Sequence, residues 1–122
     1  MTPPSSRFPR WVYGVGDEPD VRFSLANERT FLAWIRTSLA LLAGGVALEA
    51  LQLPIEHHLR FAAAILLVAL GVLAPGVAWL GWARTERAVR LREPLPSPAA
   101  FALLVVGIAA AGILVLIGMV VA

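Results

Sequence analysis

Three apolar stretches, each long enough to cross a lipid bilayer, constrain this chain more than any other feature. They cover about residues 31–53, 61–82 and 99–122. A helix of that length rises about 33–36 Å, which matches a hydrocarbon core of about 30 Å. The sequence therefore predicts an all-α integral membrane protein. Its three transmembrane helices form one domain, residues 22–122, and residues 1–21 form an irregular cytoplasmic N-terminal segment.

The composition excludes several function classes. Hydrophobic residues make up 59% of the 122 residues, and cysteine is absent. No phosphate-binding, dinucleotide-binding or hydrolase motif occurs, so we expect neither an enzyme nor a bound cofactor. All ten basic residues are arginines, and all but Arg36 flank apolar runs. They bring no nucleic-acid reader fold, so no nucleic-acid partner is expected.

Two adjacent histidines, His57 and His58, invite a metal-site hypothesis. No further histidine and no cysteine are present to complete a ligand set, so we expect no metal. We expect these residues to lie in a hydrated loop in which Glu49, Glu56 and Arg60 form polar pairs.

The uneven distribution of the arginines predicts the orientation in the membrane. Eight of the ten lie before the first apolar run or between the second and third runs. The loop between the first and second runs carries only Arg60, and Arg36 lies inside the first run. Positive residues accumulate on the cytoplasmic side, so we expect a cytoplasmic N-terminus and an external C-terminus.

The first predicted helix, with Ser24 as its expected N-cap, carries two arginines on one face. Arg29 and Arg36 are seven residues apart, so their directions differ by only about 20°. The rest of this stripe consists of small residues, which favour close helix approach, so we expect it to face protein. The small residues of the stripe are Ala33, Ala40, Ala43 and Ala47.

Arg36 can reach the headgroups or pair with Glu28 or Glu86, or it can face an anion.

The other two predicted helices also carry small residues at seven-residue spacing. In the second they are Ala64, Gly71 and Ala78. In the third, Gly107 and Ala111 form a small-xxx-small pair, and Gly118 lies seven residues after Ala111. Such seams allow helices to pack closely, within one chain or between copies. We expect a homo-oligomer, because a single three-helix subunit is too thin to enclose a polar path.

An arginine-rich stretch follows the second apolar run and is expected to prolong its helix out of the membrane. Its arginines do not converge on one helix face, which is typical of a solvated extension that contacts lipid headgroups or a partner protein. They are Arg84, Arg87, Arg90 and Arg92.

The stretch LANERTFLAWIRTSLALLAGGVAL, residues 25–48, closely resembles the signature of the YidH-like family of small bacterial inner-membrane proteins, a domain of unknown function. The same domain forms the membrane part of the fungal vacuolar transporter chaperone, which makes polyphosphate and passes it across a membrane. The resemblance implies a bacterial inner-membrane location and a polyanion path lined by Arg29 and Arg36. It also marks the motif and partner residues Asn27, Glu28, Thr30 and Trp34. This chain carries no polymerase domain, so polyphosphate synthesis is not implied.

Two functions are expected from these features. The first is a homo-oligomeric inner-membrane protein whose cytoplasmic arginine cluster binds or conducts an anion or polyanion. The alternative is a non-catalytic scaffold or accessory subunit, which docks a partner membrane protein through the NERT segment (residues 27–30) and the second loop.

Overall fold

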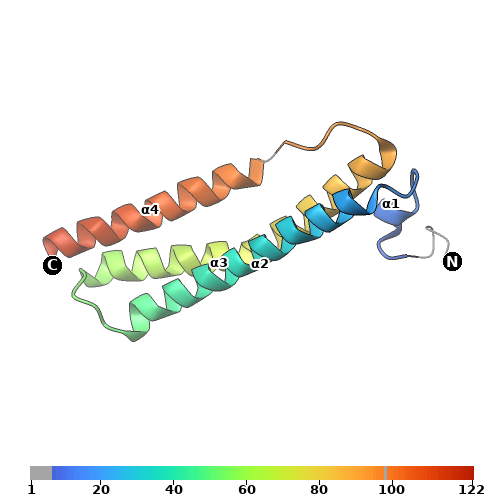
Figure 1. Ribbon diagram of the computed structural model, residues 1–122. Coiled ribbons are helices and arrows are strands. Elements are labelled where there is room, and N and C mark those ends of the chain that lie inside the picture. The colour runs from blue at the N-terminus through green and yellow to red at the C-terminus, as the bar shows by residue number, and fades with distance from the viewer. Residues whose placement is uncertain (1–6, 98) are drawn as a thin grey trace. The chain divides into compact units, whose positions relative to one another are not determined.

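The computed structural model describes residues 7–97 and 99–122, which are helical along most of their length (Figure 1). Helix α1 spans Arg10–Tyr13, α2 spans Val21–Ala50, α3 spans His57–Leu91 and α4 spans Ala99–Val121. Within the described residues no strand occurs, and α2, α3 and α4 are long and apolar enough to cross a membrane. The predicted all-α class with three membrane-spanning helices is confirmed.

Helix α2 begins earlier than predicted because Asp20, and not Ser24, caps it. The Asp20 carboxylate accepts a hydrogen bond from the backbone N–H of Arg22 at 2.9 Å. It also pairs with the Arg22 guanidinium at 2.9 Å. Both interactions lower the pKa of Asp20, and the side-chain pairing with Arg22 contributes more than the backbone hydrogen bond. Ser24 therefore lies inside the helix, and its side chain bonds elsewhere.

The turn between α2 and α3 is closed by backbone geometry and by one carboxylate. Helix α2 ends at Ala50, and Gln52 follows with a positive φ of 53°, so the helix stops before Pro54. The Glu56 carboxylate then accepts the backbone N–H of Leu59 at 2.9 Å, as an N-cap of α3 does. This bond, followed by that from His58, lowers the pKa of Glu56 to about 2.

Helix α3 continues beyond the apolar run and contains Pro75. Its end has the geometry of a Schellman motif, in which Arg92 has a positive φ of 55°. The N–H of Glu93 donates to the backbone oxygen of Ala88 at 2.9 Å, and the N–H of Arg92 donates to that of Val89 at 3.3 Å. The arginine-rich stretch is thus part of α3, as predicted.

The chain forms two compact units, and α2 and α3 contribute to both of them. The first unit comprises Met1–Trp34 and Gly76–Ser97, and the second comprises Ile35–Pro75 and Pro98–Ala122. In the first unit, residues 7–20 contain the short helix α1 and pack against the end of α3. Residues 7–20 belong to the segment that we predicted to be irregular, and apart from α1 they have no regular structure, but they are tied to α3 of the same unit.

Small residues allow close packing in the second unit. A Cβ atom on Gly107 of α4 would lie 2.5 Å from Leu70 of α3, and one on Gly118 would lie 2.5 Å from Ile55. The backbone oxygen of Gly118 also accepts the N–H of Glu56 at 2.9 Å. The small residues predicted on α3 and α4 are buried in this unit, as close packing requires: Ala64, Gly71, Gly107, Ala111 and Gly118. Ala78 is buried in the first unit.

Candidate functional site

The face of α2 that packs in the second unit carries a serine and a glycine. Ser38 is buried, and its hydroxyl donates a hydrogen bond to the backbone oxygen of Gly71 on α3. About two turns farther along, Gly45 lies so close to α3 that an added Cβ atom would be 2.8 Å from the backbone oxygen of Ala64. The hydrogen bond from Ser38 and the close contact at Gly45 therefore define which side of α2 packs against α3 in this unit.

The predicted arginine face of α2 lies away from these contacts. Arg36 is two residues, or about 200°, from Ser38, and its side chain is exposed. Ala40 and Ala43 are exposed too. Within the single chain, Ser38 and Gly45 turn the other side of α2 toward α3, so the expectation that the arginine stripe faces protein stays a prediction about an assembly of copies.

The first unit contains a buried polar network built on the predicted NERT segment. The Asn27 amide donates to the backbone oxygen of Trp82 at 2.9 Å and to the Glu86 carboxylate at 3.3 Å. The Ser24 hydroxyl donates to Glu86 at 2.6 Å. Glu86 is only 4% exposed, so this carboxylate is satisfied by neutral donors from α2. Asn27 thus fixes α2 against α3 in this unit.

The other residues of the predicted motif have more exposed positions. Glu28 and Arg29 are exposed on α2. The Thr30 hydroxyl donates to the backbone oxygen of Ala26 at 3.2 Å, within the same helix. Trp34 is partly buried. The motif therefore has one buried anchor, Asn27, beside neighbours that are accessible in the single chain.

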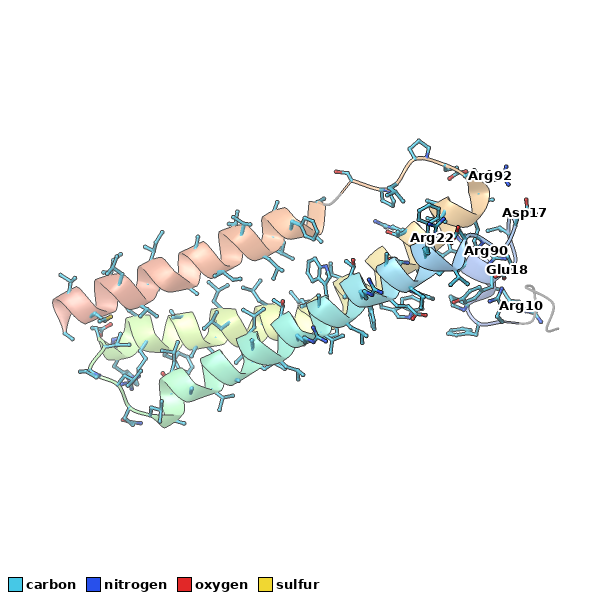
Figure 2. All side chains as sticks on the ribbon, viewed as in Figure 1. Arg10, Asp17, Glu18, Arg22, Arg90 and Arg92 are labelled. Carbon is cyan, nitrogen blue, oxygen red and sulfur yellow. The ribbon has the colours of Figure 1, made fainter. Side chains whose placement is uncertain are left out.

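Arg90 holds the N-terminal segment on the end of α3, where Figure 2 shows it beside Glu18. Its guanidinium donates to Glu18 at 3.0 Å and to the backbone oxygens of Val15 at 3.0 Å and Tyr13 at 3.3 Å. The Arg90 backbone oxygen accepts the N–H of Asp17 at 3.1 Å. The Arg90 side chain is 0% exposed, so four contacts fasten this segment around one buried arginine.

This contact corrects the predicted set of headgroup-binding or partner-binding arginines. Arg90 is excluded, because its guanidinium is buried and bonded within the chain. The guanidinium of Arg87 lies 5.1 Å from the Trp11 ring centre, within cation–π range. Arg84 and Arg92 are exposed. Arg84 and Arg92 are therefore accessible to a headgroup or partner, and Arg87, which is half-buried, is less so.

A cavity of about 230 Å³ in the first unit is acidic rather than cationic. The residues that line it include Glu18, Glu28 and Glu86 but only one arginine, Arg7, which is paired with Glu18. Tyr13 also lines it, and burial, followed by the Glu86 charge, raises the pKa of the Tyr13 hydroxyl. This cavity therefore does not provide the positive surroundings that the predicted anion site needs.

The predicted polar pairs form where α2 and α3 meet, but the expectation that His57 and His58 lie in a loop is wrong, because they are the first residues of α3. Arg60 is buried, and its Nε atom lies 3.2 Å from a carboxylate oxygen of Glu49. The same guanidinium donates to the backbone oxygen of Leu53 at 3.0 Å and lies 3.3 Å from Nδ1 of His57. His58 lies 3.0 Å from the Glu56 carboxylate. These contacts join the two ends of the loop in the second unit.

The residues that build the first unit could not be identified from the sequence. The roles of Tyr13, Glu18 and Glu86 were not predicted, because their partners in α2 or α3 lie 59 or more residues away along the chain. One signal was present for Glu86. An acidic residue beside an otherwise arginine-rich stretch implies a specific partner, and Asn27 in the resembled motif is a suitable donor.

Comparison with known proteins identifies a family and close relatives. Residues 22–88 match the family described as Domain of unknown function (DUF202). Inner membrane protein YidH of Escherichia coli (strain K12) is 48% identical over 85 residues, which are 67% of this chain and 72% of that protein. An uncharacterized protein of Mycobacterium tuberculosis is 45% identical over 101 residues, which are 81% of this chain and 82% of that protein. No solved structure matches the chain.

Proposed function

Since the chain belongs to the family described as Domain of unknown function (DUF202), we propose that this small multi-pass inner-membrane protein forms a homo-oligomer that binds an anion. Arg36 is the principal ligand in this proposal, and Arg29 is the second. The proposed ligand has phosphate or polyphosphate chemistry. Conduction of that anion through the assembly would be a further step, which binding alone does not require.

The exposure of Arg36 is the observation that carries the proposal. Its side chain leaves a membrane-spanning helix on the side that does not pack against α3. On insertion scales a charged side chain at the centre of a transmembrane helix costs about 2.5–3.5 kcal/mol, and such residues usually face protein or a water-filled cavity. A partner from outside the single chain, such as another protein chain, water or an anion, would remove this cost.

A second copy of the chain can be that partner for Arg36. Ala40 and Ala43 follow Arg36 along the exposed side of α2, and residues this small allow two helix backbones to come close in a membrane. In a symmetric assembly each copy contributes its own Arg36. Several guanidinium groups would then surround one space, an arrangement that favours anions.

Arginine favours a phosphate ligand in particular. Its planar guanidinium donates two parallel hydrogen bonds to phosphate oxygens and keeps its charge at all physiological pH values. The seven-residue spacing of Arg29 and Arg36 in the sequence is the reason that Arg29 is the second ligand of the proposal. The resemblance to the membrane part of a polyphosphate-handling complex supports the same ligand class.

The proposed orientation places this arginine side in the cytoplasm. Eight of the ten arginines lie in the N-terminal segment or the second loop, on the side that the positive-inside rule assigns to the cytoplasm. In that orientation Arg29 and Arg36 are reached from the compartment that contains phosphate metabolites, and the C-terminus lies outside.

Substitution of Arg36 tests the proposal. We expect Arg36→Leu to weaken polyphosphate binding roughly 10- to 100-fold, because charge-assisted hydrogen bonds contribute about 1.5–3 kcal/mol. Calorimetric titration of the protein in lipid nanodiscs with polyphosphate and with inorganic phosphate measures this. Arg36→Lys should lie between wild type and Arg36→Leu. Arg84→Leu, which removes an exposed arginine of α3, is the matched control and should bind as wild type does.

The scaffold alternative predicts a different pattern in the same experiment. It is supported by the exposed arginines Arg84, in α3, and Arg92, directly after α3, which could dock a partner protein. In that case Arg84→Leu loses a co-purifying membrane protein while Arg36→Leu retains it. Wild-type protein that binds neither phosphate nor polyphosphate would contradict the anion proposal.

A further inference from the structure

We propose that the N-terminal segment carries a membrane-contact surface, formed by Phe8, Arg10 and Trp11, that rests on the headgroup layer of the bilayer. We call these three side chains the aromatic–basic surface. They lie in the first unit and include neither Arg29 nor Arg36, so this inference is independent of the proposed anion site. Arg10 is labelled in Figure 2.

The segment that carries this surface is held firmly on its inner side. Val12 of α1 is fully buried, and the Tyr13 ring lies 6.2 Å from the Trp82 ring, centre to centre. Arg90 bonds three groups of the same segment. These contacts fix which side chains of α1 and its neighbours point away from α3.

The outer side of the segment is apolar and basic at once. Phe8 is 84% exposed and Trp11 is 49% exposed, although both side chains are large and aromatic. Arg10, between them in the sequence, is also exposed. The Arg87 guanidinium lies 5.1 Å from the Trp11 ring centre, which adds a second positive charge beside the surface. Exposed aromatic rings beside basic side chains are typical of a surface that contacts the headgroup layer.

The position of the segment matches the bilayer interface. The apolar part of α3 ends at Trp79 and Trp82, whose ring centres lie 6.4 Å apart. Tryptophan and tyrosine concentrate at the level of the headgroups, with apolar rings toward the acyl chains. Because Tyr13 packs on Trp82, the N-terminal segment lies at this same level. Exposed arginines there attract the negative headgroups of anionic lipids.

Spin labels at two positions of the segment test this inference directly, because the chain has no cysteine of its own. We would reconstitute Phe8→Cys and Asp17→Cys, each with a nitroxide label, in vesicles of phosphatidylethanolamine and phosphatidylglycerol. Asp17 is the matched control, since it is exposed in the same segment but is acidic. Collision rates with oxygen and with a water-soluble nickel complex report the depth of each label.

We expect the label at position 8 to collide several-fold more often with oxygen, relative to the nickel complex, than the label at position 17 does. Removing phosphatidylglycerol should reduce this difference, as should Arg10→Gln. Equal, water-like accessibility at both positions would overturn the inference. A label at position 8 that neither reagent reaches would also overturn it, because the surface would then be covered by protein.

Discussion

Replacing Arg90 with alanine is expected to release the N-terminal segment from the end of α3. The substitution removes hydrogen bonds to Glu18 and to the backbone oxygens of Tyr13 and Val15. Charge-assisted bonds contribute about 1.5–3 kcal/mol each, but Glu18 is 53% exposed, so its pairing is partly screened. We expect the docking of the segment to weaken by about 2–4 kcal/mol in total.

Hydrogen exchange at the backbone N–H of Asp17 measures this release, because that N–H donates to the Arg90 backbone oxygen only while the segment is docked. Exchange in Arg90→Ala should be roughly 30- to 1,000-fold faster, the factor that 2–4 kcal/mol implies. Arg84→Ala removes an exposed arginine from the same helix and should leave the rate unchanged. Unchanged protection of Asp17 in Arg90→Ala would show that the arginine does not hold the segment.

Replacing Gly45 with leucine is expected to force α2 and α3 apart in the second unit. The first added carbon alone would lie 2.6 Å from a methyl carbon of Val68 and 2.8 Å from the backbone oxygen of Ala64. A side chain can move, but a backbone oxygen in a helix cannot yield without displacing that helix. Overpacking of this kind costs about 1–3 kcal/mol, and contact with backbone places the expected value at the upper end of that range.

Thermal unfolding in detergent, followed by the helical signal in circular dichroism, measures the loss. Gly112→Leu is the matched control, because an added Cβ atom on Gly112 of α4 meets nothing within 4 Å. We expect Gly45→Leu to unfold at a clearly lower temperature and Gly112→Leu to differ little from wild type. Equal unfolding temperatures for the two variants would mean that Gly45 does not mark a close helix contact.

The helices of this protein could be predicted from hydropathy, because a long apolar helix is stable in a bilayer whatever it packs against. The same logic identified Gly107 and Gly118 as packing positions, since small residues on an otherwise bulky helix have few other uses. The packing face of α2 could not be predicted in this way. Ser38 and Asn27 determine it through hydrogen bonds to α3. The size of a residue does not indicate which polar side chains make such bonds.

The first unit was the part least accessible from the sequence. Residues 7–20 have no helical period, and their structure depends on contacts with Arg90, more than 70 residues away. The arginines after the second apolar run looked equivalent in the sequence, yet Arg90 is buried while Arg84 is exposed. Burial of a single arginine depends on which carbonyl groups reach it, and no local pattern encodes that.

The proposal that a second copy covers Arg36 is tested most directly by disulfide cross-linking in the native membrane. Ala40→Cys introduces a single cysteine one turn from Arg36 on the exposed side of α2, in a chain that has no other. Val72→Cys, on an exposed position of α3, is the control. We predict that mild oxidation yields a covalent dimer of Ala40→Cys and leaves Val72→Cys monomeric. Ala40→Cys that remains monomeric would contradict the account, because Arg36 would then have no neighbouring copy beside it.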